Sequence, residues 1–170
     1  MVMSCSLDSM SNMYKIGYAE DIHRLVDNRK LILGGVEIPF EKGLLGHSDA
    51  DVIFHAVGES ILGALAKGDL GTHFPDNSDA TLNMDSKLIL FKCKDLLKED
   101  GYIISNIDVS VILERPKLKP YINSIRENIA KHLDIDINNV SVKAGTNEGL
   151  DEIGKGLAIK AISICLIEKI

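Results

Sequence analysis

Strand-like and helix-like segments interleave along almost the whole chain, and this order constrains the fold more than any other feature. Extended, β-favouring runs cover residues 14–25, 31–40, 106–114, 140–145 and 157–169, and apolar residues recur at helical spacing over about 49–66, 85–99 and 121–133. Neither an internal repeat nor a long linker separates these segments. The pattern predicts a single α+β sandwich, in which a β-sheet carries its helices on one face.

This predicted layout leaves the second face of the sheet without helical cover. Three helices packed on one side cannot also bury the opposite side. A sheet face of alternating apolar residues that stays open to water usually marks a protein–protein interface. The sequence therefore predicts an oligomer.

Composition excludes several classes of protein. Of the 170 residues, 45% are hydrophobic, which is enough for a core, and residues 1–13 are polar and aperiodic, so we expect a disordered N-terminal extension before a domain at 14–170. A net charge of -6 with few aromatic residues argues against nucleic-acid binding. No apolar run approaches the ~20 residues that span a membrane, and three dispersed cysteines fit a reducing compartment. We expect a cytoplasmic, bacterial protein.

Asp21 and His23 form the first candidate for chemistry. In a strand, side chains two residues apart leave from the same face, so these two can converge on a metal ion. Such a pair also occurs as ordinary polar residues at a strand end. The interpretation as ligands depends on a third partner.

The stretch "GHSDADVIFHA" contains His47 and His55, eight residues apart. On a helix this separation turns the two side chains about 80° apart and ~12 Å along the axis, so they should not bind one ion together. Combined with Asp21 and His23, however, His55 completes an N,N,O set with an open position, as in catalytic zinc sites. The alternative for His55 is a solvated surface histidine, and Ser48 either caps the helix with Asp51 or contacts a phosphate.

Two polar loops are further candidates. "KAGTNEGL" follows a predicted strand, and its backbone amides, Thr146 and Glu148 suit a phosphate with Mg²⁺, although a plain turn has the same composition. "GDLGTHFPDNSD" is either a solvated loop or a set of groups for a ribose or polyol. Neither loop decides the function alone.

Taken together and in order, four stretches resemble the 2-C-methyl-D-erythritol 2,4-cyclodiphosphate synthase family of the non-mevalonate isoprenoid pathway. They are "IGYAEDIHRL", the run from "LILGGVEIPF" through "GHSDADVIFHA" to "THFPD", "GYIISNIDVSVILERPKLKPYI" and "VKAGTNEGL". The resemblance spans essentially residues 14–168. It implies a homotrimer of subunits with a four-stranded mixed sheet, the sheets facing one another around a three-fold axis.

The resemblance also implies an activity and its cofactors. The implied enzyme is a lyase that converts 4-diphosphocytidyl-2-C-methyl-D-erythritol 2-phosphate to the cyclic diphosphate and CMP, through attack of the 2-phosphate on the β-phosphate. It implies one Zn²⁺ per subunit on Asp21, His23 and His55, and a second divalent cation, Mg²⁺ or Mn²⁺, at Glu148. The rival interpretations are a catalytically silent relative that binds CDP and metal, and a metal-dependent phosphohydrolase.

The family likeness assigns further site residues. His47 and Thr146 match positions credited with catalysis. The resemblance also implies that each active site lies between two subunits. Substrate-binding positions correspond to Asp21, His23, His47, Ser48, Asp69, Leu70, Gly71, Phe74, Pro75, Asp76, Asn77, Ser78, Leu113, Glu114, Arg115, Pro116, Lys117, Leu118, Lys119, Ala144, Gly145, Thr146, Asn147 and Glu148.

The chain departs from the family pattern after Glu148. The family continues with a glycine and an aromatic residue, then Gly-Arg-Gly, where this chain has Asp151, Glu152 and Gly154-Lys155-Gly156. These positions are associated with a cavity on the three-fold axis that can hold an isoprenoid diphosphate. The acidic pair Asp151 and Glu152, repeated three times around the axis, should repel a diphosphate, so these two residues and Lys155 put axial binding in doubt.

Overall fold

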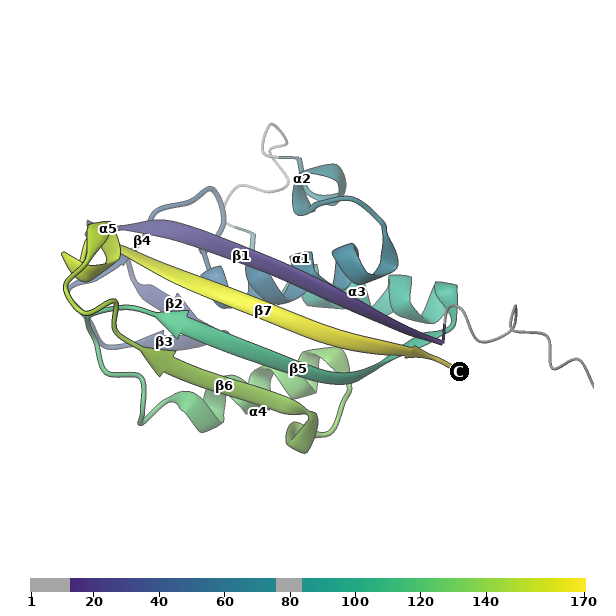
Figure 1. The fold of residues 1–170 in the computed structure, drawn as a ribbon. Helices are drawn as coiled ribbons and strands as arrows, with labels where there is room; N and C mark the ends of the chain where they lie inside the picture. The colour runs from purple at the N-terminus through teal and green to yellow at the C-terminus, as the bar shows by residue number, and fades with distance from the viewer. Residues whose placement is uncertain (1–12, 76–83) are drawn as a thin grey trace, which may run out of the picture.

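The computed structural model describes residues 13–75 and 84–170 (Figure 1). The predicted N-terminal extension, residues 1–13, lies outside the described residues except for Met13. Three of the predicted substrate-binding residues, Asp76, Asn77 and Ser78, also lie outside them.

A mixed sheet of five strands, rather than the predicted four, forms one layer of the molecule. Its order is β4 (Lys42–Leu44), β1 (Tyr14–Asp27), β7 (Ala158–Lys169), β5 (Tyr102–Ile112) and β6 (Val140–Gly145). Only β5 and β6 run parallel, and the other pairs are antiparallel. The count of four was implied by the family resemblance, and the sequence pattern did not show β4, because three residues are too few to alternate visibly.

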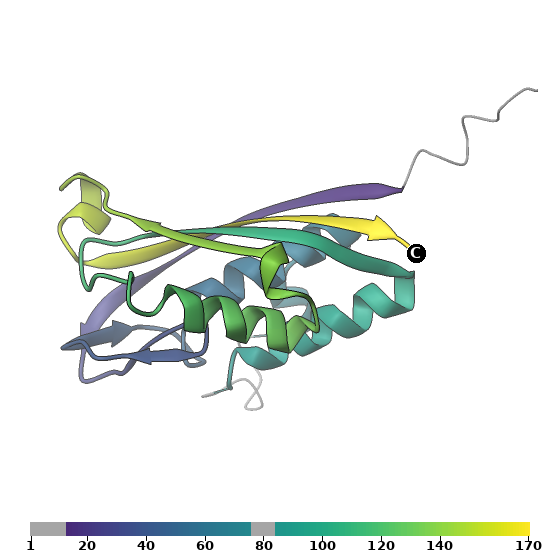
Figure 2. The same ribbon diagram turned by 90° about the horizontal axis from the view of Figure 1, so that it is seen from below.

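Three longer helices cover one face of this sheet, which confirms the predicted α+β sandwich (Figure 2). They are α1 (Val52–Leu65), α3 (Lys87–Asp100) and α4 (Ile122–Leu133), each within three residues of its predicted bounds. Along β1, Ala19 and Leu25 are buried beneath the helices. Ile16, Tyr18 and Ile22 alternate with them and stay exposed on the opposite face.

The strands β2 (Leu31–Leu33) and β3 (Val36–Ile38) form a separate two-stranded hairpin. Two of the extended runs predicted from the sequence, 14–25 and 31–40, do not pair with each other, because β1 instead runs along β7 from Tyr14↔Glu168 to Arg24↔Ala158. The tight turn between β2 and β3 uses Gly34 and Gly35, both at positive φ. It closes the hairpin locally and leaves β1 free for a distant partner.

Asp51, not Ser48, caps the start of α1. The Asp51 carboxylate accepts hydrogen bonds from the backbone N–H groups of Ile53 and Phe54, and also from those of Gly34 and Gly35 in the hairpin turn. Ser48 accepts a bond from the Ala50 N–H, one turn earlier, so the predicted capping box is wrong. The buried Asp51 thus fixes both the helix start and the position of the hairpin.

Shorter helical segments lie in stretches for which the sequence predicts only loops. They are α2 (Leu70–His73), a 3₁₀ turn at Ile137–Asn139 and α5 (Asp151–Gly154). Segments of three or four residues carry no helical period, so composition alone pointed to turns. None of the described helices has the length and apolar character needed to cross a membrane.

Helix α1 lies unusually close to β1. A Cβ atom added at Gly17 of β1 would come 1.7 Å from the Ser60 carbonyl oxygen of α1, so only glycine permits this contact. The close approach brings the first turn of α1 against the middle of β1, where the candidate metal ligands lie.

Candidate metal centre and substrate cavity

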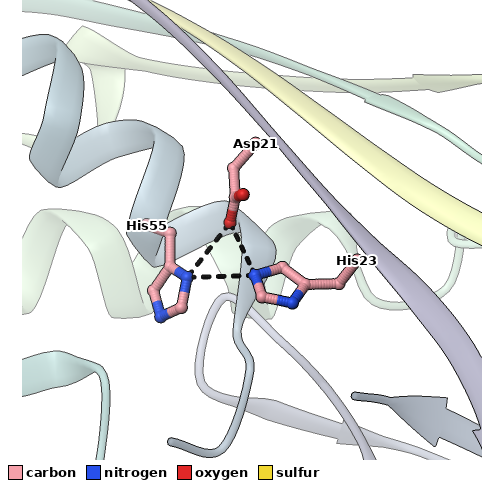
Figure 3. Close-up of side chains that lie close together, drawn as sticks. All are labelled: Asp21, His23 and His55. Atoms are coloured by element: carbon pink, nitrogen blue, oxygen red, sulfur yellow. Dashed lines mark hydrogen bonds and ion pairs between the residues drawn. The ribbon is translucent and has the colours of Figure 1, made fainter. Parts of the chain in front are cut away.

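Two elements bring the three predicted metal ligands together. Asp21 and His23 leave β1 on its helix-covered side, and His55 reaches them from the first turn of α1 (Figure 3). All three side chains are partly buried. Among the described residues they form the group of metal-ligating side chains whose donor atoms converge.

The donor atoms of these side chains form a tight triangle. The Asp21 Oδ2 atom lies 2.9 Å from His23 Nε2 and 3.0 Å from His55 Nδ1, and the two nitrogens are 3.3 Å apart. The imidazole rings meet edge to face at 62°. The arrangement leaves one side of the triangle open to an adjoining cavity.

The second nitrogen of His23 shows which atom is available to a metal. His23 Nδ1 lies 2.7 Å from the Leu45 carbonyl oxygen, which can only accept, so we assign the proton to Nδ1. The Nε2 atom then presents a lone pair to the Asp21 carboxylate. A proton or a metal cation between these two atoms removes their repulsion, and the two imidazole nitrogens and one carboxylate oxygen are a donor set that fits a divalent metal ion.

The ionisation of the cluster favours the same conclusion. Burial alone would raise the pKa of the Asp21 carboxyl, but contacts with His23 and His55 hold that pKa well below its usual range. Burial alone would lower the pKa of His23, but Asp21 raises it above the usual value. Asp21 is thus a carboxylate that attracts positive charge to this point.

A cavity of about 270 Å³ opens beside the cluster and contains several of the predicted substrate-binding residues. It is lined by His23, Gly46, His47, Ser48, His55, Leu70, Gly71, Phe74, Met84 and Ile89. His47 is exposed at this cavity and Ser48 is buried. A pocket of this size suits a small-molecule ligand.

The loop that carries His47 is held by Arg29. The guanidinium donates to the carbonyl oxygens of Gly46 at 3.1 Å and Ser48 at 2.9 Å. Neither the alternation of the strand nor the helical spacing pointed to Arg29, since it follows β1 in a charged turn. The two bonds fix the backbone on both sides of His47.

Of the predicted loop at 69–78, some described members line the cavity and others do not. Leu70, Gly71 and Phe74 line it, whereas Asp69 and Pro75 are not among the lining residues. The Asp69 carboxylate caps α2 by accepting bonds from the N–H and hydroxyl of Thr72, and these bonds lower its pKa. Asp69 therefore fixes the start of α2.

The remaining predicted residues gather at the carboxyl ends of β5 and β6. Because these strands are parallel, 113–119 and 144–148 leave the sheet at the same edge, and the Leu113 N–H donates to the Gly145 carbonyl oxygen. The Glu114 carboxylate accepts from the N–H groups of Asn147 and Gly149, while Thr146 Oγ1 donates to Glu148 at 2.9 Å. None of these residues lines the cavity beside the metal ligands.

The two residues predicted for an axial cavity form an ion pair with each other, at 2.9 Å. Glu152 also lines a hollow with Ile22 and Arg24 on the uncovered face of the sheet. Lys155 lines a different hollow, of about 310 Å³, with Glu114 and Arg115. The ion pair therefore sets the Lys155 ammonium against a carboxylate three residues away in the same segment.

Comparison with known proteins places this geometry in context. The chain matches the model of the YgbB family over residues 14–168. It is 53% identical to the 2-C-methyl-D-erythritol 2,4-cyclodiphosphate synthase of Clostridium tetani, over 91% of this chain and 98% of that protein. The enzyme of the same name from Clostridium perfringens is 54% identical, over 91% of this chain and 99% of its own length.

Solved structures show the same fold. The CDP complex of IspF from Plasmodium falciparum superposes with a TM-score of 0.82 at 37% identity, covering 93% of this chain and 97% of that one. The bifunctional IspDF from Campylobacter jejuni gives a TM-score of 0.89 at 36% identity, covering 92% of this chain and 42% of that longer chain.

Proposed function

The chain belongs to the YgbB family, and from this membership we infer that the Asp21, His23 and His55 cluster and its cavity form the active site of a 2-C-methyl-D-erythritol 2,4-cyclodiphosphate synthase. The convergence of three donor atoms beside a cavity that contains His47 and Ser48 is the observation that carries this inference.

The reaction is that of a phosphorus–oxygen lyase in isoprenoid precursor biosynthesis. It converts 4-diphosphocytidyl-2-C-methyl-D-erythritol 2-phosphate to 2-C-methyl-D-erythritol 2,4-cyclodiphosphate and CMP. An oxygen of the 2-phosphate bonds to the β-phosphorus, the bond from that phosphorus to the bridging oxygen breaks, and CMP leaves with the electron pair. Both reacting groups belong to one molecule, so the protein must fold that molecule and neutralise its charge.

We assign the metals by the chemistry of their ligands. Two imidazoles and one carboxylate with an open position favour Zn²⁺ at the cluster, and the lone carboxylate of Glu148 favours Mg²⁺ or Mn²⁺ shared with phosphate oxygens. When bound, these cations neutralise the phosphates of the substrate and polarise their phosphorus–oxygen bonds.

The side chains divide the substrate between them. His47 and Ser48 donate hydrogen bonds to the 2-phosphate, and His47 orients this phosphate toward the β-phosphorus. Leu70, Gly71 and Phe74, which line the cavity, enclose the methylerythritol part. Residues 113–119 and 144–148 receive the cytidine and its diphosphate, and Thr146 donates to the oxygens that gain charge in the transition state.

A homotrimer would bring these two halves together. Within one chain, the cytidine-side residues do not line the cavity beside the metal ligands, which supports the proposal that a neighbouring copy supplies them. The exposed apolar residues of the uncovered sheet face, Ile16, Tyr18, Ile22 and Ile164, support association through that face. We place the enzyme in the bacterial cytoplasm, consistent with buried free thiols at Cys93 and Cys165.

One reaction tests this function. The purified protein, with Zn²⁺ and Mg²⁺, is incubated with the 2-phosphorylated diphosphocytidyl-methylerythritol and followed by phosphorus NMR. Equal amounts of CMP and a cyclic diphosphate support the proposal. Linear phosphates would instead indicate a phosphohydrolase, and unchanged substrate a silent relative that only binds the nucleotide and metal.

A further inference from the structure

Ser86 and Asp49 lie directly behind His55, on the side away from the other two ligands. Ser86 precedes α3 at the N-cap position, yet its side chain makes no capping bond to that helix. Its hydroxyl is fully buried and lies 3.0 Å from His55 Nε2 and 2.5 Å from Asp49 Oδ1. A buried serine that leaves its own helix uncapped has its hydroxyl committed to another partner.

The direction of these hydrogen bonds follows from Asp49. A carboxylate only accepts, and Asp49 also accepts from two backbone groups, the N–H of Ser86 at 3.2 Å and that of Asp51 at 3.3 Å. The Ser86 hydroxyl therefore donates its proton to Asp49. Its oxygen is left as an acceptor, and Nε2 of His55 at 3.0 Å lies closer to it than Ser48 Oγ at 3.5 Å.

The consequence for His55 is a fixed tautomer. The proton sits on Nε2, donated to Ser86, and the lone pair on Nδ1 faces Asp21 and His23 (Figure 3). Without this acceptor the Asp21 carboxylate would draw the proton onto Nδ1, the atom needed for the metal. Ser48 Oγ is a second neighbour of this Nε2 atom, but at 3.3 Å it is farther away than Ser86 Oγ at 3.0 Å, and it accepts a hydrogen bond from the Ala50 N–H.

We propose that Ser86 and Asp49 are positioning residues of the metal centre: they hold the proton and the ring plane of His55 so that Nδ1 is available to the cation. For His23 the Leu45 carbonyl oxygen has the same role. The inference rests on the metal centre proposed above. Partners of this kind are commonly worth about 10- to 100-fold in metal affinity.

Metal affinity provides the first test. Zn²⁺ and Co²⁺ are titrated into the full chain against a chromophoric chelator, for the unchanged protein and for Ser86→Ala and Asp49→Asn. Ser86→Ala should weaken binding about 10- to 100-fold. Asp49→Asn should weaken it by a smaller factor, because the amide oxygen can still accept from the Ser86 hydroxyl but lacks the carboxylate charge, and the amide NH₂ then faces the Ser86 backbone N–H.

A matched variant separates this effect from general destabilisation. Ser60 is also a fully buried serine, on α1, where its hydroxyl donates to the Val57 carbonyl and lies 3.0 Å from Ser163 Oγ. Ser60→Ala removes a buried hydroxyl away from the cluster. It should lower the unfolding midpoint and leave the affinity for both metals unchanged.

The bond itself gives a spectroscopic readout. In the zinc-loaded, ¹⁵N-labelled protein, the Nε2–H signal of His55 should be sharp and protected from exchange with water, and Ser86→Ala should broaden or remove it. Metal affinity and this signal both unchanged in Ser86→Ala would overturn the inference while leaving the metal centre in place. No metal binding by the unchanged protein would overturn both.

Discussion

At the scale of single residues, the two histidines of the stretch from Gly46 to Ala56 have separate environments. His55 is confined between Asp21 on one side and Ser86 on the other, and its side chain is only 15% exposed. His47 is exposed at the cavity and depends on Arg29 for the position of its backbone. The first suits a metal ligand and the second a group that meets the substrate.

Substitution should separate these two roles. His55→Ala removes a ligand, so zinc content should fall close to zero and turnover by roughly 10³-fold or more, since several kcal/mol of charge stabilisation is lost. His47→Ala should retain zinc and lower turnover about 10²-fold, as for loss of one donor to a transition state. Metal analysis and steady-state rates measure both, and equal zinc loss in the two variants would contradict the assignment.

The Asp21 and His23 pair should give the metal-free protein an unusual pH dependence. The raised pKa of His23 means that its contribution to stability is complete below the usual histidine pKa of about 6.5 and is lost as pH rises through the raised value. With zinc bound, stability should instead increase as pH rises over the same range, because the metal binds only the deprotonated ligands.

Melting temperatures measured from about pH 6 to pH 9, with chelator in one series and excess zinc in the other, check this reversal. The range begins below the usual histidine pKa of about 6.5. His23→Gln should flatten the metal-free curve. A metal-free curve of the same slope in both proteins would show that the pair contributes nothing.

The sequence predicts the role of a residue when its partners lie a few positions away in the same element, and it fails when the partners are distant along the chain. Asp21 and His23 share a face through the two-residue period of a strand, and His55 stood out as the third donor. Arg29 and Ser86 gave no such signal, because an arginine in a turn and a serine before a helix are common everywhere. Their roles arise only from contacts across the fold.

At the scale of elements, the cluster depends on the packing of α1 against β1. Ligands from both elements meet because Gly17 lets the helix backbone approach the strand. The same geometry makes Gly17 a point at which a single methyl group changes both stability and metal binding.

Gly17→Ala should push α1 away from β1. The added Cβ would overlap the Ser60 carbonyl oxygen, and we expect a loss of about 3 kcal/mol or more in the free energy of unfolding, at or beyond the upper end of ordinary overpacking. Zinc affinity should fall with it, because His55 moves with the helix. Urea unfolding and chelator competition measure the two effects.

Gly63→Ala is the matched control on the other side of the same contact, because Gly63 lies on α1 and Gly17 on β1. Its added Cβ would have the Tyr18 carbonyl oxygen as its nearest neighbour, at 4.0 Å, and alanine is favoured over glycine in a helix. This variant should be as stable as the unchanged protein or more stable. An equal loss in both variants would contradict the role given to Gly17.

The sequence predicts the long elements well and their partners poorly. The strand at 140–145 and the three longer helices have enough residues to show their period. The pairing of β1 with β7 joins the two ends of the chain, and no local pattern encodes it. Likewise β4, α2 and α5 are too short to be distinguished from the loops around them.

At the scale of the whole molecule, the uncovered face of the sheet exposes apolar side chains, and we propose this face as the interface between subunits. Ile16 is 72% exposed there, on the side opposite the helices. In the proposed trimer this face lies against the other two copies. A charge placed on it should prevent assembly without disturbing the core of the single chain.

Ile16→Glu should therefore sediment as a monomer, keep its far-ultraviolet circular dichroism and lose activity. Leu88→Glu is the control, because Leu88 is also an exposed apolar residue but lies on α3, on the opposite side of the molecule. It should remain assembled and active. A monomeric but fully active Ile16→Glu protein would show that each chain holds a complete site.

The separation of the metal-side cavity from the loop at 144–148 has a consequence for genetics. Two defective alleles, one carrying His55→Ala and the other Glu148→Ala, each lack one half of every site when expressed alone. In a mixed assembly, some junctions would pair the intact cluster of one chain with the intact loop of the other. Co-expression of the two dead proteins should then restore part of the activity, which is intragenic complementation, whereas a cell with either allele alone should have none.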